Sequence, residues 1–113
     1  LNIQETDLAG HAEDVERYAD RLEVSDKRIA ELLPQLNVGD ILIVMADHGN
    51  DPTIGHSNHT RERVPLLIYS PGITGEYVGE RDTMADVAAT VGEYFNVESP
   101  QHGHSFLNRI FRK

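Results

Sequence analysis

Residues Ile41–Ala46, ILIVMA, are apolar at every position, and a second run of the same kind, VPLLIY, follows at Val64–Tyr69. A continuous apolar run is typical of a strand that is covered on both faces, as strands are in parallel sheets. Over Ala12–Leu33, apolar residues recur at helical spacing among charged ones, which predicts one long amphipathic helix that Pro34 ends. Together these elements predict an α/β fold with a largely parallel sheet flanked by helices.

The two ends of the chain predict further elements. Leu1–Glu5, LNIQE, predicts the end of another strand, which a short loop follows. Thr83 and Asp86 are spaced as a capping box, which predicts a helix that begins there and continues to about Phe95. The side chains expected to face the core are Val87, Val91 and either Tyr94 or Phe95. A last helix is predicted over about residues 104–111.

The composition restricts the class of protein. The chain has 113 residues, enough for one compact core, and its 10 basic against 19 acidic residues give a formal net charge of −9. Such a charge argues against a nucleic-acid partner and against an anionic membrane surface. No signal peptide opens the chain and no apolar run approaches the roughly 18 residues of a membrane span, so the cytoplasm is expected. Because the chain begins with Leu1, we expect it to be a piece of a longer polypeptide.

Aspartates and histidines follow the predicted strands. They are Asp7 and His11 after the first, Asp47 and His48 directly after ILIVMA, and His59 in the same loop. Because ligands of open α/β sheets bind at the carboxyl ends of strands, we expect these side chains to meet at one edge. The chain has no cysteine, and oxygen and imidazole ligands suit Mn, Mg or Zn. The set is too large for one four-coordinate ion but fits two ions that share a site, although an Asp-His pair alone is more typical of a solvated loop.

Several segments resemble one family. ADHGNDPT (46–53), HTRERVPLLIY (59–69) and GERDTMADVAATVGEYF (79–95) closely resemble the C-terminal part of the phosphopentomutases, two-metal enzymes of the alkaline phosphatase superfamily. ETDLAGHAEDVERYADRLEVSDKRIAELLPQL (5–36) resembles the same family's Asp and His segment and the helix after it. The resemblance implies that residues 1–113 are the C-terminal portion of such a metalloenzyme core domain, without its cap domain and N-terminal part.

The resemblance also implies a function. In this family two divalent cations, usually manganese, flank a phosphorylated threonine, and phosphate moves between C1 and C5 of a pentose. The implied ligands are Asp47 and His48 for one ion, and Asp7, His11 and His59 for the other. The family usually has five steps between the first aspartate and histidine, whereas His11 is four residues after Asp7. The full-length protein is expected to be an isomerase of the mutase kind, with a small sugar phosphate and the remainder of its own polypeptide as partners. The threonine has no counterpart here, so the chain alone is expected to be inactive.

Other residues of the loop leave alternatives open. Arg61 either meets the substrate phosphate as a bidentate donor or forms an ion pair with Glu62 or Asp51. Asp51 either orients a ligand histidine or only forms a turn, and His56 is expected in solvent. For the whole chain, the alternative to an enzyme fragment is a non-catalytic metal-binding or interaction module on the same scaffold.

Overall fold

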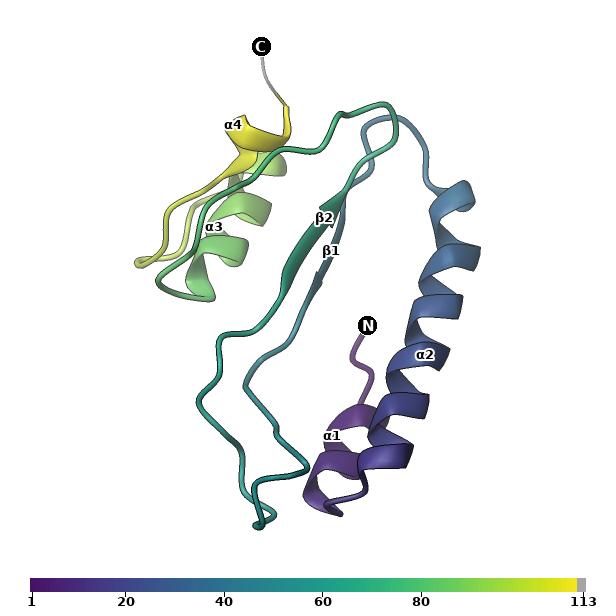
Figure 1. Ribbon diagram of the computed structural model, residues 1–113. Helices are drawn as coiled ribbons and strands as arrows, with labels where there is room; N and C mark the ends of the chain where they lie inside the picture. The colour runs from purple at the N-terminus through teal and green to yellow at the C-terminus, as the bar shows by residue number, and fades with distance from the viewer. Residues whose placement is uncertain (112–113) are drawn as a thin grey trace. The chain divides into compact units, whose positions relative to one another are not determined.

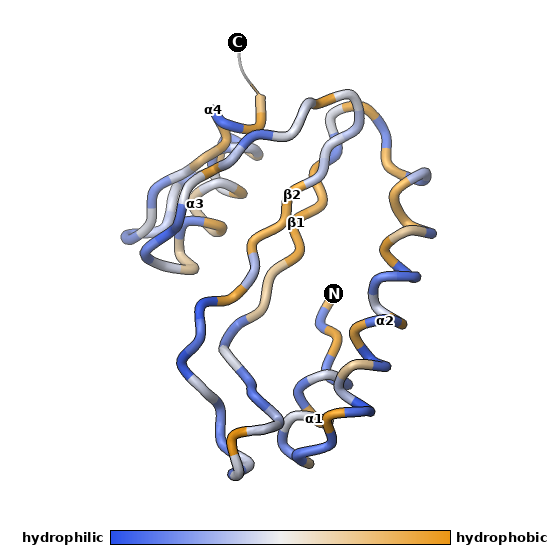
Figure 2. Tube along the Cα trace, in the orientation of Figure 1, coloured by the Kyte–Doolittle hydropathy of each residue, from blue (hydrophilic) through white to orange (hydrophobic). Residues whose placement is uncertain are grey.

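The two apolar runs form paired strands. A computed structural model describes residues 1–111, in which β1 (Leu42–Met45) and β2 (Leu66–Tyr69) are neighbours in a two-stranded sheet (Figure 1). Their pairing confirms the predicted neighbourhood, but the strands run antiparallel, so the largely parallel sheet is not confirmed. Figure 2 shows both strands as apolar between hydrophilic loops. The expected burial of both faces is also missing from β2, in which Leu67 is 61% and Tyr69 40% exposed in the described part of the chain.

Near the start of the chain, residues 1–4 form no strand and a helix follows them. The helix α1 (Glu5–His11) occupies residues for which we predicted a strand end and a loop, so that prediction is wrong. Glu5 and Asp7 lie in its first turn, where their negative charges complement the partial positive charge at that helix end. The short apolar start LNI was the basis of the strand prediction, and a run of that length does not distinguish a strand from a helix.

The predicted amphipathic helix is present as α2 (Val15–Leu32). The Asp14 carboxylate caps its start by accepting a hydrogen bond from the N–H of Arg17 at 3.0 Å. Pro34 lies in a 3₁₀ turn, η1 (Leu33–Gln35), and the helix ends before it, as predicted. α2 packs against α1, yet none of its residues is fully buried. The apolar stripe is therefore only partly covered by the described residues.

Two compact units divide the chain. One contains Leu1–Asn37 and Ile43–Leu67, and the other contains Val38–Leu42 and the residues from Ile68 onward. The first unit holds all five predicted metal ligands. None of the helices in the described part of the chain has the length and apolarity that crossing a bilayer requires.

The second unit is built around α3 (Ala85–Tyr94) and the short helix α4 (Leu107–Ile110). Its buried apolar side chains include Ala89, Phe106 and Ile110. Of the side chains expected to face the core, Val87 is half-buried, but Val91, Tyr94 and Phe95 are 44%, 40% and 66% exposed, so the prediction is wrong for these three. The buried face of α3 instead carries small and polar residues, namely Asp86, Ala89, Thr90 and Gly92.

A buried carboxylate joins α3 to the segment before α4. Asp86 is 3% exposed, and it accepts hydrogen bonds from Arg81 Nε at 2.6 Å and from the N–H of His104 at 2.9 Å. Burial by itself would raise the pKa of Asp86, but the His104 N–H and the Arg81 guanidinium together hold it below its ordinary value. The predicted capping box is not formed: α3 is capped by Met84, the Thr83 hydroxyl accepts from the N–H of Ala85 at 3.2 Å, and Asp86 serves this ion pair instead.

Candidate metal centre

The loop between β1 and β2 folds back on itself through a single antiparallel bridge. Gly49 and Thr60 form this bridge, in which the N–H of Thr60 donates to the Gly49 carbonyl at 3.0 Å. A side chain at position 49 would place its Cβ 2.8 Å from the Thr60 oxygen, closer than real Cβ atoms approach. The bridge carries His48 and His59 on adjacent segments, and their imidazole rings stack with centroids 3.5 Å apart and planes 17° apart.

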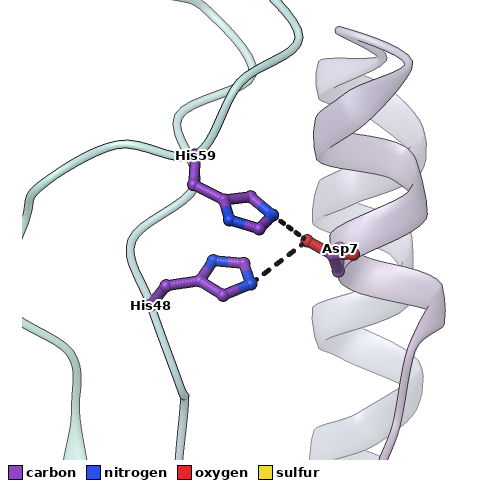
Figure 3. Close-up of side chains that lie close together, drawn as sticks. All are labelled: Asp7, His48 and His59. Atoms are coloured by element: carbon purple, nitrogen blue, oxygen red, sulfur yellow. Dashed lines mark ion pairs between the residues drawn. The ribbon is translucent and has the colours of Figure 1, made fainter.

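Asp7 faces this pair of histidines from α1. Its Oδ1 atom lies 3.6 Å from His48 Nε2 and 3.5 Å from His59 Nε2. Figure 3 shows the two rings pointing toward the same carboxylate, one above the other. Because the three ligand atoms all lie within 4.8 Å of one another, these residues form a group that could hold a metal ion.

His11 completes the cluster from the last turn of α1. Its Nε2 atom lies 3.4 Å from Asp7 Oδ1, since residues four apart share one face of a helix. The same Nε2 lies 3.0 Å from His59 Nε2. The spacing from Asp7 to His11 is one residue shorter than in the phosphopentomutases, yet both side chains of α1 still reach the loop that carries His48 and His59.

Backbone carbonyls determine which ring nitrogens are free to bind a cation. His11 Nδ1 lies within hydrogen-bond distance of the Ser57 carbonyl, and His48 Nδ1 lies 3.0 Å from the Gly49 carbonyl. A carbonyl oxygen only accepts, so each Nδ1 donates its hydrogen, and in the neutral ring Nε2 is then the nitrogen whose lone pair can bind a cation. Histidines that bind metals are held in the same way, with the second ring nitrogen donating to a carbonyl or carboxylate.

The spacing of these atoms fits a small divalent cation. Ligand atoms at 2.0–2.2 Å from a tetrahedral ion are separated by roughly 3.3–3.6 Å. The three distances from Asp7 Oδ1 to the Nε2 atoms of His11, His48 and His59 are 3.4, 3.6 and 3.5 Å, within this range, whereas the 3.0 Å between the Nε2 atoms of His11 and His59 is below it. Lone pairs that face one another at such distances repel unless a cation or proton lies among them. One carboxylate with imidazole nitrogens is a donor set that Mn²⁺ and Zn²⁺ accept.

His48 lies near the carboxylates of both ligand sets that the family resemblance implies. His48 shares Asp7 with His59, although the resemblance paired His48 with Asp47. Asp47 Oδ1 lies 3.5 Å from His48 Nε2, but its side chain is 87% exposed. Asp47 therefore lies at the rim of the cluster, and its role as a ligand of a second ion stays a prediction.

The remaining loop residues are placed as follows. Arg61 is exposed, and its contact with a phosphate stays a prediction. Asp51 Oδ1 accepts from the N–H and the hydroxyl of Thr53 at 2.8 and 2.7 Å, which agrees with the turn role. His56 is exposed, as predicted. The residue that the sequence interpretation missed is Asn50, whose side-chain amide donates to Asp7 Oδ1 at 3.1 Å.

Two comparisons with known proteins found similar sequences. The family model described as the metalloenzyme superfamily matches residues 1–99. A phosphopentomutase from Herpetosiphon aurantiacus is 45% identical over 111 residues, which cover 96% of this chain. The chain spans 28% of the length of that relative.

Proposed function

Because the chain belongs to the metalloenzyme superfamily, whose members bind divalent metal ions, we propose that it carries part of the metal centre of a phosphopentomutase-like mutase. The full-length protein would move a phosphoryl group between C1 and C5 of a pentose phosphate. The observation that supports this most is the convergence of Nε2 atoms from separate segments on one carboxylate oxygen, Asp7 Oδ1. An exposed solvated loop does not require such an arrangement.

The proposal assigns five ligands and two ions. Asp7, His11 and His59 hold one cation, and Asp47 and His48 contribute to a second, with Mn²⁺ as the expected metal and Mg²⁺ or Zn²⁺ as alternatives. When bound, the cations stabilise charge on the transferring phosphoryl group. His48 Nε2 lies 3.6 Å from Asp7 Oδ1 and 3.5 Å from Asp47 Oδ1. His48 is therefore the residue that lies between the two proposed cation sites.

The chain's own residues position the ligands. The Gly49–Thr60 bridge sets the relation between His48 and His59, and α1 presents Asp7 toward both. Arg61, next to the bridge, is proposed to bind the substrate phosphate. In this proposal the phosphoryl-accepting threonine lies outside the 113 residues, so the chain alone is expected to show no turnover.

The test compares two histidines of the same loop in the full-length protein. With Mn²⁺ and ribose 1-phosphate, His59→Ala should lower the rate of ribose 5-phosphate formation by more than about 100-fold, since even residues that only support a ligand cost 10- to 100-fold. His56→Ala is the matched control and should leave the rate nearly unchanged, because His56 is exposed and its Nδ1 only accepts from the N–H of Asn58 at 3.2 Å. Equal losses from both variants would contradict the ligand assignment. Mn²⁺ binding without any turnover on pentose phosphates would instead support a non-catalytic metal-binding module.

A further inference from the structure

Asn50 lies beside the proposed centre and has no role in the ligand set described above. Its Nδ2 atom donates to Asp7 Oδ1 at 3.1 Å and approaches the main-chain oxygen of Asp7 at 3.4 Å. Both partners only accept hydrogen bonds, so the amide nitrogen must be the atom that faces them. The side chain thus bridges the histidine loop to α1 across a sequence separation of 43 residues.

Gly10 makes room for this contact. It is buried in α1, and a Cβ at this position would fall on the Asn50 amide at distances well under the 3.0 Å that real Cβ contacts observe. A glycine within a helix costs about 1 kcal/mol relative to alanine, so its presence here requires a reason. The close approach of the Asn50 amide to the α1 backbone supplies one.

From these contacts we infer that Asn50 is a positioning residue for the metal centre, which acts by holding Asp7 Oδ1 toward the histidines, and that Gly10 is required for it. The inference rests on the proposed function, because it assumes that Asp7 is a ligand. A carboxylate can rotate about its Cβ–Cγ bond and present either oxygen. The Asn50 donor holds one Asp7 oxygen toward His48 and His59. Less rotational freedom of the Asp7 carboxylate is then lost when a cation binds.

The experiment measures Mn²⁺ affinity of the full-length protein from the free Mn²⁺ signal in electron paramagnetic resonance. Asn50→Ala should raise the Kd by about 10- to 100-fold, the usual effect of losing a group that orients a ligand. Asn108→Ala, at an exposed position in α4, is the matched control and should leave the Kd unchanged. At saturating Co²⁺, the visible absorption bands of the Asn50→Ala protein should differ from those of the parent, because the Asp7 oxygen is no longer fixed.

Two further variants separate a donor role from a packing role. Asn50→Asp keeps the shape but replaces the donor with a second carboxylate oxygen facing Asp7, so it should bind Mn²⁺ more weakly than the parent. Gly10→Ala should weaken binding by displacing the amide, and combining it with Asn50→Ala should add little, since both remove the same contact. Gly75→Ala, where an added Cβ meets nothing within 4 Å, is its control.

The outcomes distinguish this inference from the proposed function. If the parent protein binds Mn²⁺ and the Asn50→Ala and Asn50→Asp variants bind it equally well, the positioning role is wrong while the metal centre stands. Full additivity of Gly10→Ala and Asn50→Ala would also overturn the inference. If the parent protein does not bind Mn²⁺, the proposed function fails, and the inference fails with it.

Discussion

The ion pair between Arg81 and Asp86 should be the most sensitive point for the stability of the second unit. Asp86→Ala removes the acceptor of the Arg81 Nε hydrogen bond and of the His104 N–H hydrogen bond. Arg81 also donates to the His104 carbonyl at 3.0 Å, and its guanidinium carbon lies 5.5 Å from the centre of the Phe106 ring. The cation would therefore stay beside an apolar ring after losing its counter-ion.

The magnitude follows from these contacts. Hydrogen bonds to charged groups contribute about 1.5–3 kcal/mol each, and breaking a buried pair by removing one partner costs about 3–5 kcal/mol. The Arg81 side chain is 25% exposed, so water can partly replace the lost acceptor, and we expect a loss near the lower end, about 3 kcal/mol. For a small domain this corresponds to a decrease in Tm of more than about 10 °C.

Urea unfolding followed by circular dichroism measures this loss. Asp82→Ala is the matched control, because Asp82 is exposed, and it should change the free energy of unfolding by less than about 0.5 kcal/mol. In a double-mutant cycle, Arg81→Ala should cost less in the Asp86→Ala background than in the parent. A loss below about 1 kcal/mol for Asp86→Ala, or strict additivity with Arg81→Ala, would refute the structural role of the pair.

Two other predictions concern acid and the loop bridge. The pKa of Asp86 is lowered in the folded state, so its stabilising contribution should be fully present above the ordinary pKa of about 3.9 and lost as pH falls through the folded-state pKa. The difference in unfolding free energy between the parent and Asp86→Ala should therefore shrink below about pH 4 and stay constant above it. A difference independent of pH down to pH 2 would be inconsistent with this. Gly49→Ala should cost about 1–3 kcal/mol and weaken Mn²⁺ binding, because the added methyl must push Thr60 away, whereas Gly75→Ala should do neither. An unchanged Kd for Gly49→Ala would mean that the bridge does not set the histidine geometry.

The sequence predicted those elements whose signals are local. The uninterrupted apolar runs located β1 and β2, and the helical spacing followed by Pro34 located α2. Strand direction depends on the path of the intervening loop, here closed by the Gly49–Thr60 bridge, and no local pattern reports that path. For the same reason Asp86, which matches a capping box by spacing, proved to bind Arg81 and a residue 18 positions further along.

The candidate site shows a similar division. The residue types and their positions after the predicted strands predicted that Asp7, His48 and His59 would lie together, and their side chains do converge. The sequence predicted that these side chains would meet, but which imidazole faces which carboxylate depends on tertiary distances that it does not report. Asn50 was missed because an asparagine in a loop has no distinctive signal. Gly10 would have been informative only if its segment had been recognised as a helix.

The most direct test of the metal centre is a crystal structure of the full-length protein grown with Mn²⁺, with anomalous diffraction recorded at the manganese edge. We expect an anomalous peak about 2.0–2.3 Å from Asp7 Oδ1 and from the Nε2 atoms of His11 and His59, with a second peak beside Asp47 and His48. Manganese-saturated crystals without a peak at Asp7, or with the only peak bound by other residues, would contradict the assignment of this cluster as the metal centre.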